Sequence, residues 1–181
     1  MKKKFIVLLI MFNFFNNASA NYDQLAHNFV FNSIDGQSIN LKDYKEKIIV
    51  VVNVASRCGF TKQYNDLQNL WVNYKDKNLV VIGIPTNDFK QEPGSNEDIK
   101  NFCETNFNIN FPMTEKINVL GKNAHPFYQW AKSNFGNSAV PKWNFHKIII
   151  GKDGKIIDTF ASITSPSSKR FINFIEKQIR N

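Results

Sequence analysis

Two cysteines are the residues best suited to chemistry in this 181-residue chain, which contains only Cys58 and Cys103. A thiolate is a strong nucleophile, and oxidants convert it reversibly to a sulfenic acid or a disulfide. Cys58 follows an apolar, β-branched run that predicts a buried strand, and a predicted helix begins shortly after it. Open α/β sheets place their ligand sites at the carboxyl ends of strands. Cys58 is therefore a candidate reactive thiol.

The neighbours of Cys58 favour its thiolate but leave other roles open. Arg57 and the unpaired N–H groups at the start of a helix stabilise negative charge. Position alone is equally consistent with two inert, packed cysteines or with a permanent disulfide. A thiol-disulfide oxidoreductase is a further alternative, but such enzymes carry Cys-x-x-Cys at the helix start, and Thr61 occupies the second cysteine position here.

Three separated sequence blocks resemble the glutathione peroxidase family. The first is NVASRCGFT at 53–61, the second is the run 83–89 followed by QEPGSN at 91–96, and the third is KWNF at 142–145. The blocks occur in the family order and at about the family spacing, and the resemblance covers nearly all of the chain after residue 20. It implies a thioredoxin-like fold and a cysteine-based peroxidase activity.

The same resemblance implies a catalytic site of four residues. Cys58 would attack the terminal oxygen of a hydroperoxide, which forms a sulfenic acid and releases water or an alcohol. The Gln91 amide, the Trp143 indole N–H and the Asn144 amide would stabilise charge on the sulfur and on the leaving oxygen, so that no histidine base is needed. Without the resemblance, Trp143 would be a core aromatic, and Gln91 and Asn144 would be turn residues.

Cys103 lies in a predicted helix, at a position similar to the resolving cysteine of family members that are reduced by thioredoxin. Its thiol would condense with the sulfenic acid on Cys58 to form a disulfide. A disulfide requires Cα atoms within about 7 Å, so this helix would have to unfold in part during each cycle. The resemblance thus predicts a labile segment at 101–107. A permanent disulfide between Cys58 and Cys103 is the alternative.

The resemblance also bears on partners and cofactors. The segment 133–142 is short where tetrameric, glutathione-using relatives carry a longer insertion. This implies a monomer that is reduced by a thioredoxin-like protein, with glutathione as the other reductant, and no metal, haem or nucleotide cofactor. His27, His125 and His146 lack metal-ligand spacing and are expected at the surface or partly packed, with a supporting role near the site open for His146. A non-enzymatic redox sensor or thiol-disulfide relay of the same fold is the alternative function.

The predicted elements place these residues in one α/β domain. Apolar runs at 47–56 and 79–84 predict buried parallel strands, and apolar residues at helical spacing within 67–74 predict the helix between them. The order of elements predicts a thioredoxin-like fold with a central mixed β-sheet flanked by helices and an N-terminal β-hairpin. The remaining expected elements are a hairpin within 29–41, helices at 96–106 and 124–133, strands at 146–150 and 155–160, and a terminal helix that starts at Ser165-Pro166.

The first 20 residues predict a secretory signal peptide. Three lysines at 2–4 precede an apolar run at 5–15, and the small residues ASA follow at 18–20. The apolar run is shorter than the roughly 20 residues that span a bilayer, so cleavage after Ala20 is favoured over a retained anchor. The chain is therefore expected to be exported to the periplasm as a single domain at 21–181.

Charge and composition exclude little but argue against a nucleic-acid partner. The formal net charge is +8, and three of the lysines lie in the predicted leader. The remaining Lys and Arg residues alternate with Asp and Glu rather than forming one basic run, which is typical of a solvated surface.

Overall fold

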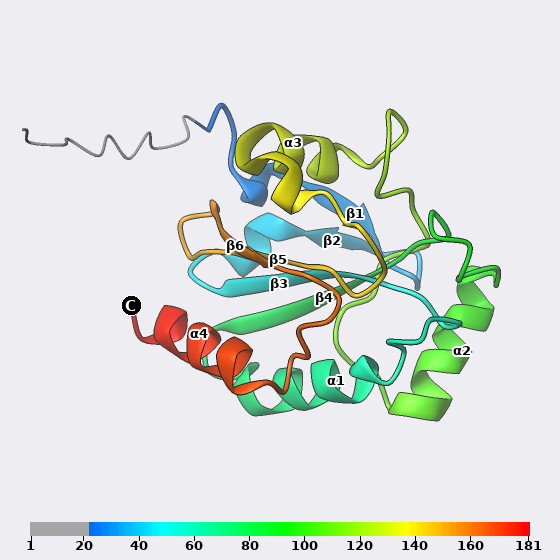
Figure 1. Ribbon diagram of the computed structural model, residues 1–181. Coiled ribbons are helices and arrows are strands. Elements are labelled where there is room, and N and C mark those ends of the chain that lie inside the picture. The colour runs from blue at the N-terminus through cyan, green and yellow to red at the C-terminus, as the bar shows by residue number, and fades with distance from the viewer. Residues whose placement is uncertain (1–21) are drawn as a thin grey trace, which may run out of the picture.

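The structure is a computed structural model that describes residues 22–181, and the predicted signal peptide at 1–20 lies outside them. Its centre is a four-stranded mixed sheet in the order β4-β3-β5-β6 (Figure 1). β3 and β4 are parallel, whereas β5 is antiparallel to both β3 and β6. The predicted central mixed sheet is therefore confirmed. The four strands are β3 (Ile48–Val54), β4 (Leu79–Pro85), β5 (Lys147–Ile150) and β6 (Ile156–Phe160).

Helices cover both faces of this sheet. Two helices lie on one face, and a third helix lies on the other face together with the N-terminal hairpin, while α2 stands at one end of the strands (Figure 1). The first face carries α1 (Gln63–Tyr74) and α4 (Lys169–Arg180), the second carries α3 (Pro126–Phe135), β1 (Val30–Asn32) and β2 (Ser38–Asn40), and α2 is Asn96–Phe107. Short 3-10 turns are η1 (Ala26–Asn28), η2 (Leu41–Tyr44) and η3 (Gly136–Ala139).

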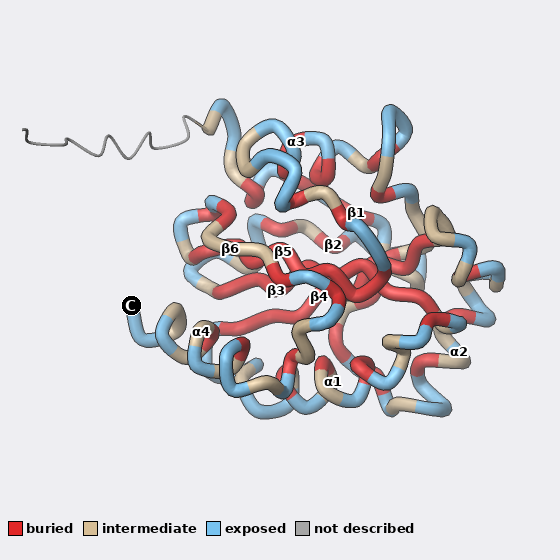
Figure 2. The backbone as a smooth tube through the Cα atoms, in the orientation of Figure 1, coloured by how far each residue is buried: buried red, intermediate tan, exposed pale blue. Residues whose placement is uncertain are grey.

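The apolar run of β3 explains why the sheet separates two cores. Every residue of β3 is buried, and successive side chains point to opposite faces of a strand. Val50 and Val52 belong to the cluster that contains α1 and α4, whereas Ile49 and Val51 belong to the cluster that contains α3 and the hairpin. Figure 2 shows this buried sheet between partly exposed helices. Within residues 22–181, no helix is both long and apolar enough to cross a membrane.

The strand directions bring three loops to one edge of the sheet. In the parallel pair, Val54 at the end of β3 lies opposite Pro85 at the end of β4. In the antiparallel pair, Val52 lies opposite Lys147, the first residue of β5. The carboxyl ends of β3 and β4 therefore meet the amino end of β5. All three sequence blocks singled out above lie in the connections at this edge.

Two helices begin later than the sequence pattern predicted. The terminal helix starts at Lys169 rather than at 165–166, because the Ser168 side chain accepts a 3.3 Å hydrogen bond from the Phe171 N–H and so caps that turn. Ser165 instead folds back locally, and its Oγ accepts a 3.1 Å bond from the Ser167 N–H. α3 likewise starts at Pro126, whose fixed φ suits the first helical position.

Candidate active site

Cys58 lies in a tight turn between β3 and α1. The Cys58 N–H donates a 3.0 Å hydrogen bond to Thr61 Oγ1, which in turn donates a 3.0 Å bond to the carbonyl oxygen of Ala55. The Thr61 N–H closes the turn with a 3.0 Å bond to the Cys58 carbonyl. Thr61 therefore fixes the backbone on both sides of the cysteine, a role that sequence analysis had not assigned to it.

The sulfur of Cys58 is nearly buried but not sealed. The residue is 8% exposed, and the Phe60 N–H donates to its Sγ at 3.4 Å. This N–H belongs to the series of turns that leads into α1, in which the Gln63 and Tyr64 N–H groups donate to the carbonyl oxygens three residues before them. Such a donor favours negative charge on sulfur.

Gln91 reaches the site on the loop that follows β4. The Arg57 N–H donates a 3.0 Å bond to the Gln91 carbonyl oxygen, which holds this loop against the Cys58 turn. The next residue, Glu92, adds two more contacts, because its Oε2 accepts bonds from the Ser56 N–H at 2.7 Å and from the Ser56 hydroxyl at 2.9 Å. Three hydrogen bonds thus join the loop after β3 to the loop after β4.

Asn144 and Trp143 arrive from the third loop, just before β5. Asn144 is fully buried, and its side-chain N–H donates a 3.0 Å bond to Gln91 Oε1. Trp143 is 40% exposed, and its ring lies 5.4 Å from the ring of Phe89, centre to centre. The turn depends on Phe145, which has a left-handed φ of 66° and donates a 2.6 Å backbone bond to Asn53.

The structure brings the predicted site residues onto adjoining segments but pairs only two of them directly. In the part of the chain that is described, no hydrogen bond joins Cys58 Sγ to Gln91, Trp143 or Asn144, and none occupies Gln91 Nε2 or Trp143 Nε1. An amide group carries two N–H donors, so Asn144 also keeps one free. Three side chains therefore keep free N–H groups at this edge of the sheet.

Cys103 lies on α2, buried in the same core cluster as Cys58, with 2% of its surface exposed. Both cysteines are free thiols. Burial raises the pKa of Cys103 to about 11, and the neighbouring Tyr64 hydroxyl offsets part of this rise in the pKa. Cys103 is therefore a protonated, weakly nucleophilic thiol at neutral pH while α2 is folded.

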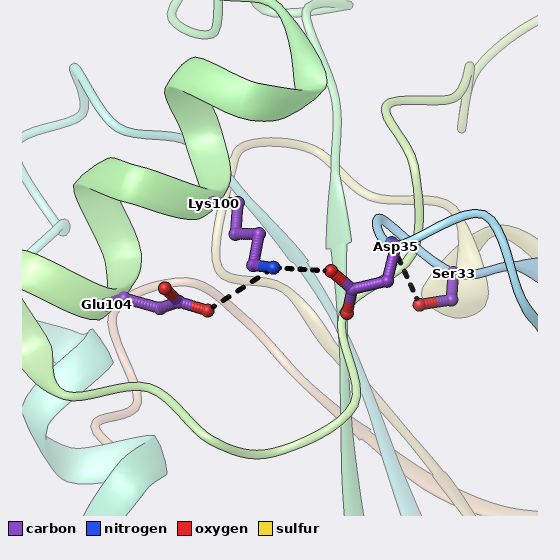
Figure 3. A network of polar contacts seen from close by, with 4 residues as sticks. All are labelled: Ser33, Asp35, Lys100 and Glu104. Carbon is purple, nitrogen blue, oxygen red and sulfur yellow. Dashed lines mark hydrogen bonds and ion pairs between the residues drawn. The ribbon is translucent and has the colours of Figure 1, made fainter.

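Both ends of α2 are well defined, and one side is tied to the hairpin. Ser95 and Asp98 form a reciprocal capping box at its start, and Asn108 adopts a left-handed conformation just after its end. Lys100 pairs with Asp35 at 2.6 Å and approaches Glu104 at 3.9 Å (Figure 3). A cavity of about 530 Å³ lies between this helix and the hairpin, and Cys103 is part of its wall.

Two of the three histidines are more buried than expected, whereas His125 is partly packed as predicted. His27 and His146 are buried rather than at the surface or partly packed, and the Nε2 atom of each lacks a hydrogen-bond partner. His146 is buried because it lies directly before the buried strand β5. Burial and the nearby charge of Lys147 lower the pKa of His146 to about 4. It is neutral at physiological pH. Among residues 22–181, no group of three His, Cys, Asp or Glu side chains could hold a metal ion.

Comparisons with known proteins show which family this chain belongs to. The family model described as Glutathione peroxidase matches residues 26–132. A hydroperoxy fatty acid reductase of Synechocystis is 38% identical over 157 residues, which cover 82% of this chain and 93% of the relative. Glutathione peroxidase-like peroxiredoxin 2 of Saccharomyces cerevisiae is 44% identical over 138 residues, which cover 74% and 85% of the two chains.

A solved structure shows the same fold. The crystal structure of T. cruzi GPX1 matches with a TM-score of 0.67 at 28% sequence identity, over 87% of this chain and 98% of the other. The chain therefore belongs to the glutathione peroxidase family, with its thioredoxin-like fold, and it is a thiol peroxidase that reduces hydroperoxides.

Proposed function

We propose that Cys58 is the thiol that reacts with the hydroperoxide, assisted by the side chains of Gln91, Trp143 and Asn144. The observation that carries this proposal is the meeting of three loops at one sheet edge, where the Phe60 N–H donates to Cys58 Sγ at 3.4 Å and three side-chain donors keep free N–H groups. Donors fixed in advance stabilise developing charge at little reorganisation cost.

In the first step, the Cys58 thiolate attacks the terminal oxygen of the hydroperoxide. The sulfur–oxygen bond forms as the oxygen–oxygen bond breaks, so that sulfur is oxidised to a sulfenic acid. The leaving oxygen takes a proton from solvent and departs as water or an alcohol. The free N–H groups of Trp143 and Asn144 suit the negative charge that grows on this oxygen.

In the second step, Cys103 resolves the sulfenic acid. The Cys103 thiolate attacks the oxidised sulfur of Cys58, so that the sulfur–sulfur bond forms as the sulfur–oxygen bond breaks, and the leaving hydroxide takes a proton from solvent and departs as water. While α2 is folded, burial holds the pKa of Cys103 at about 11. Partial unfolding of α2 would return this thiol to water, lower its pKa toward the usual range and bring it to Cys58.

The cycle closes when an external dithiol reduces this disulfide. A thioredoxin-like protein is the preferred reductant, with glutathione as the other candidate, and the name of the yeast relative as a peroxiredoxin supports thiol-dependent recycling. Hydrogen peroxide and organic hydroperoxides are both candidate substrates, and the name of the Synechocystis relative supports organic ones. The protein would act as a monomer in the periplasm, after removal of the signal peptide at 1–20.

Turnover of single-cysteine variants tests this function. Cys58→Ser should abolish hydroperoxide consumption in the presence of thioredoxin and its reductase. Cys103→Ser should lose thioredoxin-supported turnover while a sulfenic acid accumulates on Cys58, detectable with a dimedone probe and mass spectrometry. Sustained turnover by Cys58→Ser would overturn the proposal. A parent protein that forms the disulfide but does not turn over would instead be a redox relay.

A further inference from the structure

Glu92 is a buried carboxylate that the proposed reaction does not use. Only 1% of the residue is exposed, and no Lys, Arg or His of the described chain pairs with its carboxylate as a salt bridge. Its Oε2 accepts both of its hydrogen bonds from one residue, Ser56. An unpaired buried carboxylate opposes folding, so its presence calls for a compensating role.

This carboxylate joins the loop that carries Gln91 to the turn that carries Cys58. Glu92 directly follows Gln91, and Ser56 lies two residues before Cys58. The Glu92 N–H is fixed in turn by a 3.0 Å bond to Asn87 Oδ1, so that the carboxylate is anchored to its own loop. Movement of Ser56 relative to Glu92 would therefore change the distance between the sulfur and the Gln91 amide.

We propose that Glu92 is a positioning residue for peroxide reduction, whose carboxylate holds Ser56 and so sets the place of the Cys58 sulfur relative to Gln91. This inference rests on the proposed roles of Cys58 and Gln91. A carboxylate is suited to the task because one ionised oxygen accepts two hydrogen bonds and donates none, and such charge-assisted bonds are stronger than neutral ones.

The charged groups around Glu92 set how it responds to pH. Burial raises the pKa of Glu92, while the Ser56 bonds and the charges of Lys116 and Arg57 work in the opposite direction. On the side of α2, Asp98 lines a cavity of about 160 Å³ that also borders Glu92. The remaining titratable neighbours are Tyr64 and Cys103, whose own pKa values the Glu92 charge helps to raise.

A pH effect follows from this arrangement. When the pH falls through the raised pKa of Glu92, protonation removes the charge that strengthens both Ser56 bonds. The peroxide step of the parent protein should therefore slow on the acid side, above the pH at which an ordinary carboxyl group titrates. Glu92→Gln has no such proton to gain, and any other protonation slows both proteins alike, so the ratio of the parent value of kcat/KM to the Glu92→Gln value should fall as the pH falls.

Separate measurement of the oxidation and reduction steps of the cycle distinguishes a positioning role of Glu92 from a purely structural one. The value of kcat/KM for hydrogen peroxide reports oxidation of Cys58, whereas kcat/KM for dithiothreitol reports reduction of the oxidised enzyme. Partial loss of the fold lowers both values equally. A displaced sulfur lowers only the first, because reaction rates depend steeply on the alignment of the reacting atoms.

The decisive variants are Glu92→Gln and Glu92→Ala, with Glu97→Gln as the matched control on an exposed carboxylate of α2. We expect kcat/KM for hydrogen peroxide to fall about 10-fold in Glu92→Gln and about 100-fold in Glu92→Ala. The value for dithiothreitol should stay unchanged, and the ratio of the parent value to the Glu92→Gln value for hydrogen peroxide should fall as the pH falls. Ser56→Ala should have a smaller effect of its own and add nothing to Glu92→Ala.

Several results would overturn the inference: equal losses in both values of kcat/KM, full peroxide activity in Glu92→Gln, or a ratio of parent to Glu92→Gln peroxide activity that does not change with pH. If Glu92→Ala does not fold, Glu92→Gln decides alone because it keeps the size of the side chain. Cys58→Ser in the same assay separates the two proposals. Activity in Cys58→Ser would remove the proposed function, whereas an inactive Cys58→Ser with a fully active Glu92→Gln would remove only the role of Glu92.

Discussion

The side-chain amide of Asn144 donates a 3.0 Å hydrogen bond to Gln91 Oε1, across 53 residues of sequence. The two residues lie on different loops, and each loop is separately tied to β3 or to the turn that follows it. Gln91 is held through the Arg57 N–H, and the Asn144 loop is held through a 3.2 Å bond from Asn53 Nδ2 to the Trp143 carbonyl. The mutual bond uses the Gln91 oxygen and therefore directs its free N–H groups away from Asn144.

We expect Asn144→Ala to lower kcat/KM for hydrogen peroxide by about 100-fold, because it removes one donor and frees Gln91 to rotate. Stopped-flow measurement of peroxide consumption would give this value. Asn144→Asp keeps the shape but supplies no N–H, so it should be as inactive as the alanine variant. Asn137→Ala, at an exposed asparagine, should retain full activity, and an active Asn144→Asp would contradict the role of the amide.

Thr61 supplies a second prediction, about the turn that carries the cysteine. Thr61→Val keeps the volume but loses the hydroxyl that binds both the Cys58 N–H and the Ala55 carbonyl. The free energy of unfolding should fall by about 1 to 3 kcal/mol, because two buried backbone groups lose their partner. Urea denaturation would measure the change. Thr61→Ser, which keeps the hydroxyl, should stay close to the parent, and an equal loss in both variants would refute this account.

The thiol of Cys103 should make α2 less stable at alkaline pH. Burial raises its pKa from 9.0 to about 11, so the folded helix binds this proton more tightly than the opened helix does. Between about pH 9 and pH 11, opening of α2 therefore releases this proton. The free energy of opening α2 falls as the pH rises through this range, by at most about 2 to 3 kcal/mol. Below pH 9 this pKa shift should have no effect on opening.

Hydrogen exchange of the α2 amides between pH 8 and 11, corrected for the intrinsic rate, would measure this effect. Cys103→Ala has no thiol proton to lose, so its corrected opening free energy should be independent of pH over the same window. A parent protein with the same pH dependence as Cys103→Ala would contradict the prediction.

The ion pair between Lys100 and Asp35 joins α2 to the hairpin and supplies a fourth prediction (Figure 3). Both side chains are partly exposed, so Lys100→Met should change global stability by less than about 1 kcal/mol. Local opening of α2 should nevertheless become easier, and disulfide formation after a pulse of peroxide should accelerate by up to about fivefold. Lys132→Met on α3 is the matched control. A slower disulfide in Lys100→Met would show that the pair assists resolution instead.

The sequence was sufficient where one physical effect dominates a segment. The unbroken apolar runs predicted both parallel strands, because only a strand covered on two faces tolerates such runs. The helix predicted at 96–106 is α2, and Ser95 forms a capping box with Asp98 at its start. The three sequence blocks were also found to lie at one edge of the sheet, although the catalytic roles of their residues stay predictions.

The sequence could not reveal features that depend on acceptors or donors from distant segments. Lys147 begins β5 and is fully buried, with its Nζ donating to Gln63 Oε1 at 2.6 Å and to the Thr164 carbonyl at 2.7 Å. Burial lowers its pKa to about 7. Nothing near Lys147 in sequence indicates these partners, which come from α1 and from the loop before α4. The hydrogen bonds of the Glu92 carboxylate could not be predicted for the same reason, since their donor, Ser56, lies 36 residues away in sequence.

The two ends of the segment that contains α2 are anchored to fixed parts of the molecule. Before the helix, the Lys116 ammonium group donates to the carbonyl oxygens of Glu92 and Gly94. After it, Gly83 in β4 bonds to the Pro112 carbonyl and to the Thr114 N–H, each at 2.9 Å. An opened α2 would therefore be a short tether with both ends held, which keeps the local concentration of the Cys103 thiol around Cys58 high. Such a tether would let the internal thiol capture the sulfenic acid before a second peroxide molecule could drive the sulfur to an irreversible sulfinic state.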